Sequence, residues 1–384
     1  MNTSIGASFR LARFDSERGW TAPIPRELDS ASTLVLVFGG SNLRDDPEPI
    51  AEVAAAFPDS HLLGCSTSGQ IHGAELHDGG LSVAAFRFAR ASVRTASAPV
   101  RSAEDSCRAG RLLVEQLDAP GLAAVLVYSD GLNVNGTELV NGINGALGAR
   151  AVVTGGLAGD GTAFKRTWVL RNDEPREGFV VAAGLYGDSV RVGHGSKGGW
   201  DAFGPERTVT RSKGNVLYEL DGKPALALYK TYLGKRASGL PATGLLFPLA
   251  MRSCPQDPKV LVRTLLAVDE REQSMTFAGD IPTGSCAQLM RANFERLISD
   301  AGSAASLTGA LERGAPCLAV AVSCVGRRLV LGERTEEELE AVHDSLPQGS
   351  GMIGFYSYGE ISPYATGSCD LHNQTMTLTT IGEE

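Results

Sequence analysis

Residues 64–71, GCSTSGQI, place a thiol and three hydroxyl groups between two glycines. A Cys could act as a nucleophile if a neighbouring base formed its thiolate, and an α/β-hydrolase Ser needs the spacing G-x-S-x-G before a helix. Here two residues separate Ser66 from Gly69, and the segment that follows has the pattern of a strand. An enzyme that uses Cys65 or Ser66 therefore stays an alternative to a binding protein.

Residues 354–361, GFYSYGEI, repeat this arrangement near the end of the chain. Phe355 stands at the position of Cys65, so the second copy cannot do thiol chemistry. Glycines allow the backbone to approach another group closely, and turns at the carboxyl ends of strands are where α/β folds bind ligands. The repetition fits a turn that shapes the fold as well as one that lines a site, and both interpretations are open.

The second copy is aromatic and acidic, with Tyr356, Tyr358 and Glu360. A carboxylate beside aromatic faces suits an ammonium-bearing ligand. As an enzyme, the chain could instead use Asp160 and Glu360 as an acid–base pair. The related stretch GGLAGDG lacks G-x-G-x-x-G and precedes strand-like residues, which argues against a nucleotide phosphate site.

We therefore predict one ligand site formed by the glycine-rich turns and the C-terminal tail. Its candidate ligand-binding residues are Cys65, Ser66, Thr67, Gly155, Gly156, Asp160, Tyr356, Tyr358, Glu360 and Asn373.

The elements that position these turns are repeated along the chain. GLSVAAFRFARASVR (80–94) matches GFVVAAGLYGDSVR (178–191), and apolar runs, a helical segment and a glycine-rich turn precede both. Each unit is predicted to run strand, helix, strand, turn, strand, strand, over about 30–97 and 121–195. A third copy begins at residue 316 and ends in a tail, 371–381, that alternates like an edge or hairpin strand.

The predicted fold class is α/β (α+β) with mixed sheets in two domains. The predicted division is an extension at 1–29, one domain at 30–195 and a second at 196–384. We expect a helix from about Cys286 with Ser285 as its N-cap, and another at 335–346 opened by a capping box of Thr335 and Glu338.

Composition limits the class of protein. The net charge is −9 and no basic run exists, so nucleic acid and anionic membrane surfaces are poor partners. Seven dispersed cysteines without C-x-x-C suit a reducing compartment. No apolar run of about 18 residues and no signal peptide are found, so a cytoplasmic protein without a membrane span is expected.

Several motifs together resemble the FIST proteins, whose chains carry an N-terminal and a C-terminal FIST domain. They are GCSTSGQI, GGLAGDGTAF, VLYELDGKPALALYKTYLG, GDIPTGS, RRLVLGERTEEELE, GFYSYGEI and LHNQTMTL. The resemblance covers roughly residues 30–381. It implies a sensory module for small ligands such as amino acids, whose output passes through a partner protein; a homo-oligomer is possible.

A stand-alone bacterial subset of this family looks like the present chain in length and layout. Those proteins sense nitric oxide through haem and regulate a histidine kinase or a cyclic-di-GMP enzyme. The resemblance therefore implies haem b as a possible cofactor, and we take His72, His194 and His372 as candidate axial ligands. The alternative is a sensor of amino acids or other small metabolites without haem. No other metal site is expected.

Overall fold

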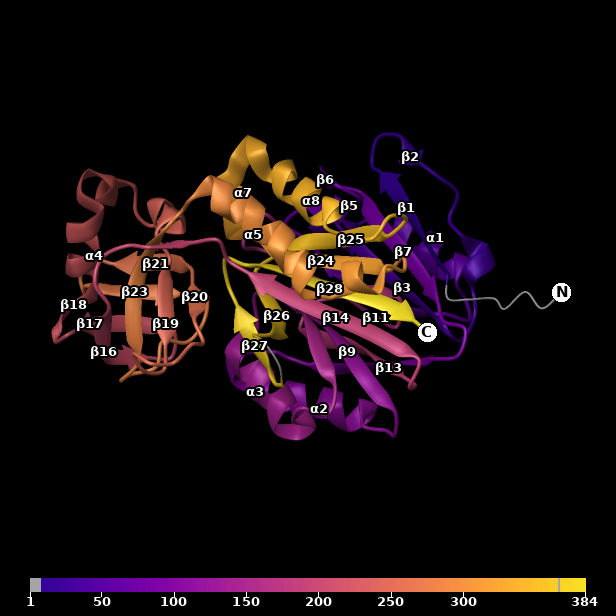
Figure 1. Ribbon diagram of the computed structural model, residues 1–384, viewed down its shortest axis with the longest axis horizontal. Coiled ribbons are helices and arrows are strands. Elements are labelled where there is room, and N and C mark those ends of the chain that lie inside the picture. Colours follow the sequence, from indigo (N-terminus) through magenta and orange to yellow (C-terminus); the bar gives the residue numbers. More distant parts are fainter. Residues whose placement is uncertain (1–7, 365–366) are drawn as a thin grey trace.

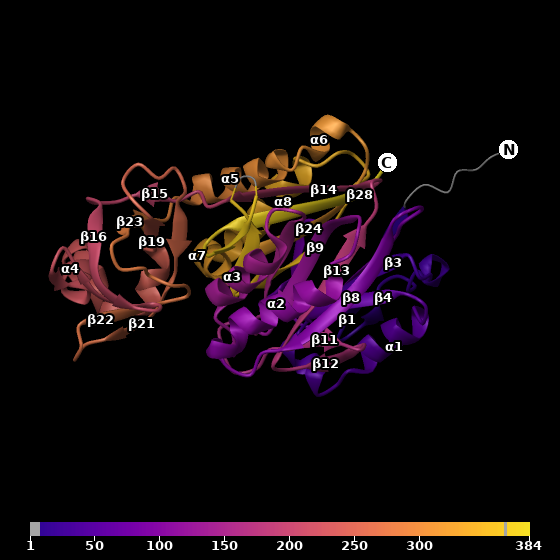
Figure 2. The same ribbon diagram turned by 90° about the horizontal axis from the view of Figure 1, so that it is seen from below.

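The computed structural model describes residues 8–364 and 367–384, which form a large body and a smaller lobe (Figure 1). The lobe consists of residues 201–291, and the body consists of the described residues on either side of it. Three sheets with helices outside them make up the body, and the lobe projects from one end (Figure 2). The predicted mixed α/β class is confirmed.

The first sheet of the body has the strand order β12-β11-β4-β3-β7-β1-β2. Its elements are β1 Ser8–Asp15, β2 Gly19–Trp20, β3 Thr33–Gly39, α1 Glu48–Ala56, β4 His61–Ser66, β7 Leu81–Arg87, β11 Val169–Arg171 and β12 Glu174–Arg176. β3 and β4 are parallel, and α1 joins them. Every residue of β3 is buried because α1 covers one face of the sheet and the other sheets cover the second.

The second sheet has the order β27-β26-β10-β9-β13-β8. Its elements are β8 Ser92–Pro99, α2 Ser106–Leu117, β9 Leu122–Ser129, α3 Gly136–Leu147, β10 Val152–Leu157, β13 Phe179–Tyr186, β26 Gly359–Pro363 and β27 Cys369–His372. β9 and β10 are parallel and are joined by α3. The apolar faces of α2 and α3 pack on this sheet, which buries Leu113 and Ile143.

The third sheet has the order β14-β28-β24-β25-β5-β6. Its elements are β5 Gln70–His72, β6 Glu75–His77, β14 Val190–Lys197, α5 Phe294–Leu307, α6 Ala310–Arg313, β24 Leu318–Cys324, α7 Val325–Leu331, α8 Thr335–Asp344, β25 Gly351–Ser357 and β28 Met376–Glu383. β24 and β25 are parallel, with α7 and α8 between them in the chain. α5 and α8 bury their apolar faces on it.

The three sheets share one plan, and each receives a short hairpin from another repeat. β5 and β6 form a hairpin after the first glycine-rich turn, and β5 pairs with β25 of the third sheet. β11 and β12 follow the second turn and pair with β4, and β26 and β27 follow the third turn and pair with β10. The predicted repeat therefore occurs three times, with an exchanged hairpin inserted after each turn.

One glycine is required at the same place in all three repeats. An added Cβ at Gly64 would lie 2.0 Å from a carbonyl oxygen of β3, and at Gly155 or Gly354 it would lie 1.8 Å from a carbonyl oxygen of β9 or β24. Real Cβ atoms do not approach backbone so closely. The close approach of the two parallel strands thus explains why the motif begins with glycine each time.

The inner faces of the three sheets meet in a shared core. Phe38 of β3, Tyr128 of β9 and Phe355 of β25 contact one another there, with ring centroids 4.8–5.6 Å apart. Each ring comes from a different sheet, so this aromatic cluster joins the three repeats.

The lobe is a single strongly bent sheet with one helix. Its elements are β15 Asp201–Ala202, β16 Arg207–Lys213, β17 Val216–Leu220, β18 Lys223–Pro224, α4 Ala225–Leu233, β19 Leu249–Arg252, β20 Leu261–Arg263, β21 Leu265–Asp269, β22 Ser274–Phe277 and β23 Cys286–Arg291. α4 places Leu226 and Tyr229 against its core. Two adjacent connections, near Asp201 and Arg291, join the lobe to the body.

The predicted helix from Cys286, its N-cap Ser285 and the capping box of Thr335 and Glu338 were wrong. Cys286 begins the strand β23, not a helix, because its alternating buried residues pair with β19 and β16. The helix starts later, where the side chain of Asn293 accepts a hydrogen bond from Arg296 N. Thr335 does not form a capping box, since it lies inside α8 and its hydroxyl donates to Gly332 O.

The C-terminal tail was expected to form an edge or hairpin strand. β27 is a hairpin strand, but β28 lies between β24 and β14 and is almost entirely buried. The predicted boundary at 195/196 falls within β14, and the second and third sheets combine strands from both sides of it. No helix in the described part of the chain is long and apolar enough to cross a membrane.

Candidate ligand-binding site

The three glycine-rich turns meet at the end of the body that faces the lobe. Gly159 N donates to Ser66 O at 3.0 Å, which joins the second turn to the first. Ser68 N donates to Tyr356 O at 2.8 Å and joins the first turn to the third. Tyr358 N donates to Leu157 O at 3.2 Å and closes the ring.

The first turn keeps its reactive groups inside the protein. Cys65 is fully buried in the shared core, and burial raises the pKa of its thiol. Ser66 Oγ accepts a hydrogen bond from Trp168 N at 3.0 Å, and Thr67 Oγ1 lies 2.6 Å from the side-chain amide of Gln70. These side chains stabilise the turn, and none of them faces a cavity.

The second turn is organised by Asp160. Its carboxylate accepts hydrogen bonds from the backbone N–H groups of Phe164, Lys165 and Arg166 at 2.8 Å, and from the hydroxyl of Tyr358. Burial opposes ionisation, but these hydrogen bonds hold the pKa of Asp160 below its usual value. Gly155 and Gly156 lie in β10 against β9 and β26.

Glu360 is fully buried between the second and third sheets. It accepts hydrogen bonds from Ser357 Oγ at 2.7 Å and from Thr375 N and Oγ1 at 3.2 and 2.9 Å. Burial raises the pKa of Glu360 to about 8, so the acid is mostly protonated at neutral pH. It has no free face for an ammonium group, and it does not meet Asp160 as an acid–base pair.

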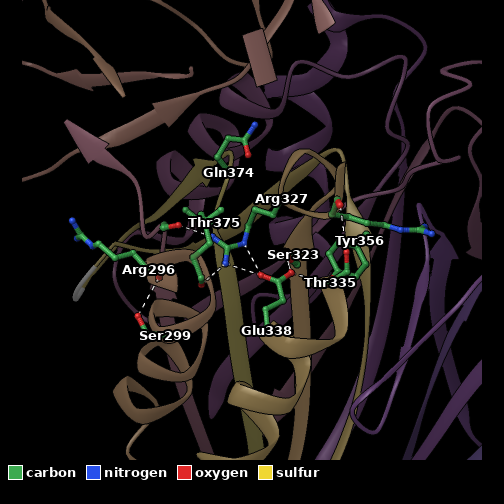
Figure 3. Close-up of polar contacts among 12 residues, drawn as sticks. Arg296, Ser299, Ser323, Arg327, Thr335, Glu338, Tyr356, Gln374 and Thr375 are labelled. Atoms are coloured by element: carbon green, nitrogen blue, oxygen red, sulfur yellow. Dashed lines mark hydrogen bonds and ion pairs between the residues drawn. The ribbon is translucent and has the colours of Figure 1, made fainter. Parts of the chain in front are cut away.

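Tyr356 belongs to a buried polar network around Arg327 and Glu338 (Figure 3). Its hydroxyl donates to Glu338 Oε1 at 2.7 Å. Gln374 points away from this network in Figure 3, and its amide lies against Gly326. Asn373 is also fully buried, and neither atom of its amide has a hydrogen-bond partner among the described residues.

A cleft of about 580 Å³ lies between the body and the lobe. The body provides its lining chiefly from the second and third turns and from the starts of α3 and α7. The lobe provides the segment 239–245 after α4, parts of β21 and β22, and the residues that follow β22. The lining residues are Ala103, Gly131, Leu132, Val134, Asn135, Gly136, Leu157, Phe164, Asn215, Gly239, Leu240, Pro241, Ala242, Leu245, Thr264, Leu265, Leu266, Phe277, Ala278, Gly279, Asp280, Cys324, Val325, Gly326, Leu329 and Tyr358. Of the ten predicted ligand residues, Tyr358 alone is among them.

The cleft has an apolar, partly open wall. Phe164, Leu266 and Leu329 are 51%, 45% and 42% exposed, although large apolar side chains are usually covered. Phe164 stacks on Tyr358 with ring centroids 4.5 Å apart. Its φ of +50° is unusual for a residue with a side chain, and the carboxylate of Asp160 holds its backbone in place.

The three candidate haem ligands lie outside the lining of the cleft. His372 is fully buried, its Nε2 donates to Ser362 O at 2.9 Å, and burial lowers its pKa to about 4. His72 Nδ1 lies 2.9 Å from Ser82 Oγ, and burial lowers its pKa to about 4 as well. His194 is on β14, where burial lowers its pKa. None of the three lines the cleft.

Two other side chains of the cleft could in principle bind haem iron, and neither is free to do so. Burial raises the pKa of the Cys324 thiol, which disfavours the thiolate that iron would need. The hydroxyl of Tyr358 is already bonded to Asp160. The residues present therefore do not fit an axially ligated haem in this cleft.

Most residues of the cleft were missed by sequence reasoning. Asp280 and Gly279 lie in GDIPTGS, a stretch that had been noted only as a mark of the family. Asn135 carried a detectable signal, because it caps α3: its side chain accepts a hydrogen bond from Glu138 N. The apolar lining has no local pattern, since it comes from many separate segments of the chain, between Ala103 and Tyr358.

Comparison with protein-family models gives two matches. The model of the FIST N domain matches residues 33–223, and the model of the FIST C domain matches residues 225–363. A comparison with curated proteins finds no match. FIST domains are small-ligand sensory domains of signalling proteins. With both models matched in order along most of its length, the chain belongs to the FIST family.

Proposed function

We propose that this protein is a small-ligand sensor that binds its ligand in the cleft between the body and the lobe. The observation that carries the proposal is the cleft itself, an apolar cavity of ligand size to which both parts contribute residues. A ligand that contacts both parts stabilises one placement of the lobe over others. This change of placement is the signal that a partner protein reads.

The connections between the two parts are narrow enough for such a movement. Asp201 lies at the neck, where its carboxylate bonds to Asn293 Nδ2 at 3.0 Å and to Arg296. On the side of β27, Arg263 Nη1 donates to Leu371 O at 3.1 Å and Lys259 pairs with Asp370. A bound ligand adds contacts on the cleft side that the body and the lobe do not make with each other.

The proposed partner is a histidine kinase or a cyclic-di-GMP enzyme, which carries over from the family resemblance. The haem-based form of the proposal, nitric oxide sensing, rests on that resemblance alone. Adding haemin and then nitric oxide to the purified protein tests it. A stoichiometric Soret band that shifts with nitric oxide, and that is lost when His72, His194 or His372 is replaced by alanine, would favour haem-based sensing over the sensing of a metabolite.

Ligand binding in the cleft can be measured with N-phenyl-1-naphthylamine, a neutral probe that fluoresces in apolar sites. Leu329→Ser removes an exposed apolar side chain of the cleft and should weaken probe binding several-fold. Leu307→Ser is the matched control, because Leu307 is 56% exposed on α5 and lies outside the cleft. Equal probe affinity in the two variants would refute the cleft as the binding site.

Movement of the lobe can be followed with spin labels. Cys254 is exposed on the lobe, and Glu340 is exposed on α8 of the body. A protein with Cys107→Ser and Glu340→Cys therefore carries one accessible thiol on each part. We expect a compound that displaces the probe to narrow or shift the distance distribution between the labels.

A further inference from the structure

The cleft has an unusual balance of charge. Among the described residues that line it, Asp280 is the one with a formal charge, and no Lys, Arg or His is present. Asp280 forms no ion pair within 4.0 Å in the described part of the chain. An anionic ligand would therefore meet a carboxylate in the cleft, where no cation among the described residues lines the wall to attract it.

The carboxylate of Asp280 is held in place by a hydrogen bond to one of its two oxygens. Its Oδ1 accepts a hydrogen bond from Asn135 Nδ2 at 3.2 Å, which links the lobe to the start of α3. The side chain of Arg263 packs against Gly279, where an added Cβ would lie 2.8 Å from its Nε. Its guanidinium donates to the carbonyl oxygens of Asp280, Val262 and Leu371 at 3.1–3.2 Å, so it fixes this segment of the lobe. Arg263 attracts the Asp280 carboxylate through space but makes no direct ion pair with it, so the carboxylate oxygens keep room for a further donor.

Another polar side chain of the cleft, Thr264, has a hydroxyl without a hydrogen-bond partner in the described chain. Thr264 is 5% exposed, and its Oγ1 has no hydrogen bond among the described residues. Ala278 N donates to Thr264 O at 2.9 Å, which places Thr264 on the same part of the lobe as Asp280. A buried hydroxyl without a partner is unfavourable, so a ligand polar group that reaches Thr264 Oγ1 through a small shift of the cleft wall would be stabilised.

The apolar part of the cleft complements this polar part. Phe164 and Tyr358 present a stacked aromatic wall, and Leu266 and Leu329 are exposed at the cleft. We propose that the cleft selects compact amphiphilic amines, with an ammonium group at Asp280 Oδ2 and Thr264 Oγ1 and an aromatic or aliphatic body against Phe164 and Leu329. This inference rests on the proposed function and names the ligand class of the same site.

Three probes of similar shape and different charge test the selection: 2-phenylethylamine, 2-phenylethanol and phenylacetate. Each is titrated against the protein loaded with N-phenyl-1-naphthylamine. We expect the amine to displace the probe best, the alcohol less well and the acid least. Displacement by phenylacetate at the same or lower concentration than the amine would overturn the inference, and so would a failure of all three to displace the probe.

Asp280→Asn should weaken the amine about tenfold, the size expected for a charged hydrogen bond, and change the alcohol little. Glu272→Gln is the matched control, because it removes one charge from an exposed site of the lobe outside the cleft. An equal loss of amine affinity in Glu272→Gln, or none in Asp280→Asn, would overturn the assignment.

A third variant covers the case in which Asp280→Asn folds poorly. Thr264→Val keeps the shape of the side chain and removes its partnerless hydroxyl, so we expect unchanged or higher thermal stability and weaker binding of the amine and the alcohol. Suppose that Thr264→Val and Asp280→Asn leave the affinity for the amine unchanged while Leu329→Ser still weakens binding of the naphthylamine probe. The preference for amines is then refuted, and the cleft remains the proposed binding site. If Leu329→Ser also has no effect, the proposed function fails with it.

Discussion

Arg327 and Glu338 form an ion pair at 2.7 Å in which both side chains are completely buried. Arg327 also donates to Gly198 O and Leu297 O, and Glu338 accepts from Ser323 and Tyr356. The pair thus connects α7 and α8 to the third sheet and to the chain that enters the lobe.

Arg327→Met should destabilise the protein by about 3–5 kcal/mol, because it leaves the carboxylate of Glu338 buried without its cation. Urea unfolding measures the loss. Arg211→Met is the control, since the Arg211–Glu219 pair is exposed on the lobe and its loss should cost less than about 1 kcal/mol. Similar losses in both variants would contradict the burial of the Arg327 pair.

Glu360 should make stability fall as pH rises. Its pKa is about 8 in the folded protein and about 4.5 when exposed, so the folded state binds the extra proton across this range. Its stabilising contribution is complete below pH 4.5 and is lost as pH rises through 8. Glu360→Gln should remove this slope in urea unfolding between pH 5 and 8. An unchanged slope would show that the acid is ionised in the fold.

His372 should act in the opposite direction. Burial lowers its pKa to about 4, while an exposed histidine titrates near 6.5. The folded state therefore binds fewer protons, and stability falls as pH decreases from 6.5 to 4. His372→Gln should reduce this acid destabilisation, although His72 contributes over the same range. An NMR titration of the His372 ring with a midpoint near 6.5 would contradict the prediction.

The glycine shared by the three repeats should not tolerate a side chain. Gly354→Ala places a Cβ 1.8 Å from Ala321 O, so we expect a loss of more than about 3 kcal/mol or a failure to fold. Gly145→Ala is the control. Gly145 is exposed within α3 with nothing near its Cβ, and alanine there should stabilise the protein by up to about 1 kcal/mol. Thermal melting compares the two.

The repeat could be predicted from the sequence, because apolar strands and glycine-rich turns recur with local patterns. The exchange of hairpins between the repeats could not be predicted. β5 and β11 have three residues each, which is too short for an alternating pattern, and their partners lie far away in the chain. The sequence predicts a helix too early, from Cys286, because the helical pattern that begins eight positions later, at Phe294, follows the strand directly.

The candidate site was predicted in part. The convergence of the turns follows from their positions at the ends of equivalent strands, and the structure shows it. The cleft lies between these turns and the lobe, so its position depends on how the body and the lobe pack against each other. The packing of the body against the lobe produces no sequence motif, so Asp280 and Thr264 could not be identified from the sequence as residues of the site.

The exchanged hairpins also set the order in which the chain can fold. Each sheet contains strands of at least two repeats, and β28, the last strand of the chain, lies inside the third sheet. During synthesis, β5, β6 and β14 emerge long before β24, β25 and β28 exist to pair with them, so their edges stay open on the ribosome. Such distant pairing slows folding and exposes sheet edges to aggregation. The third sheet can therefore be completed only once β28 has been synthesised, in a step that joins residues from both FIST domains.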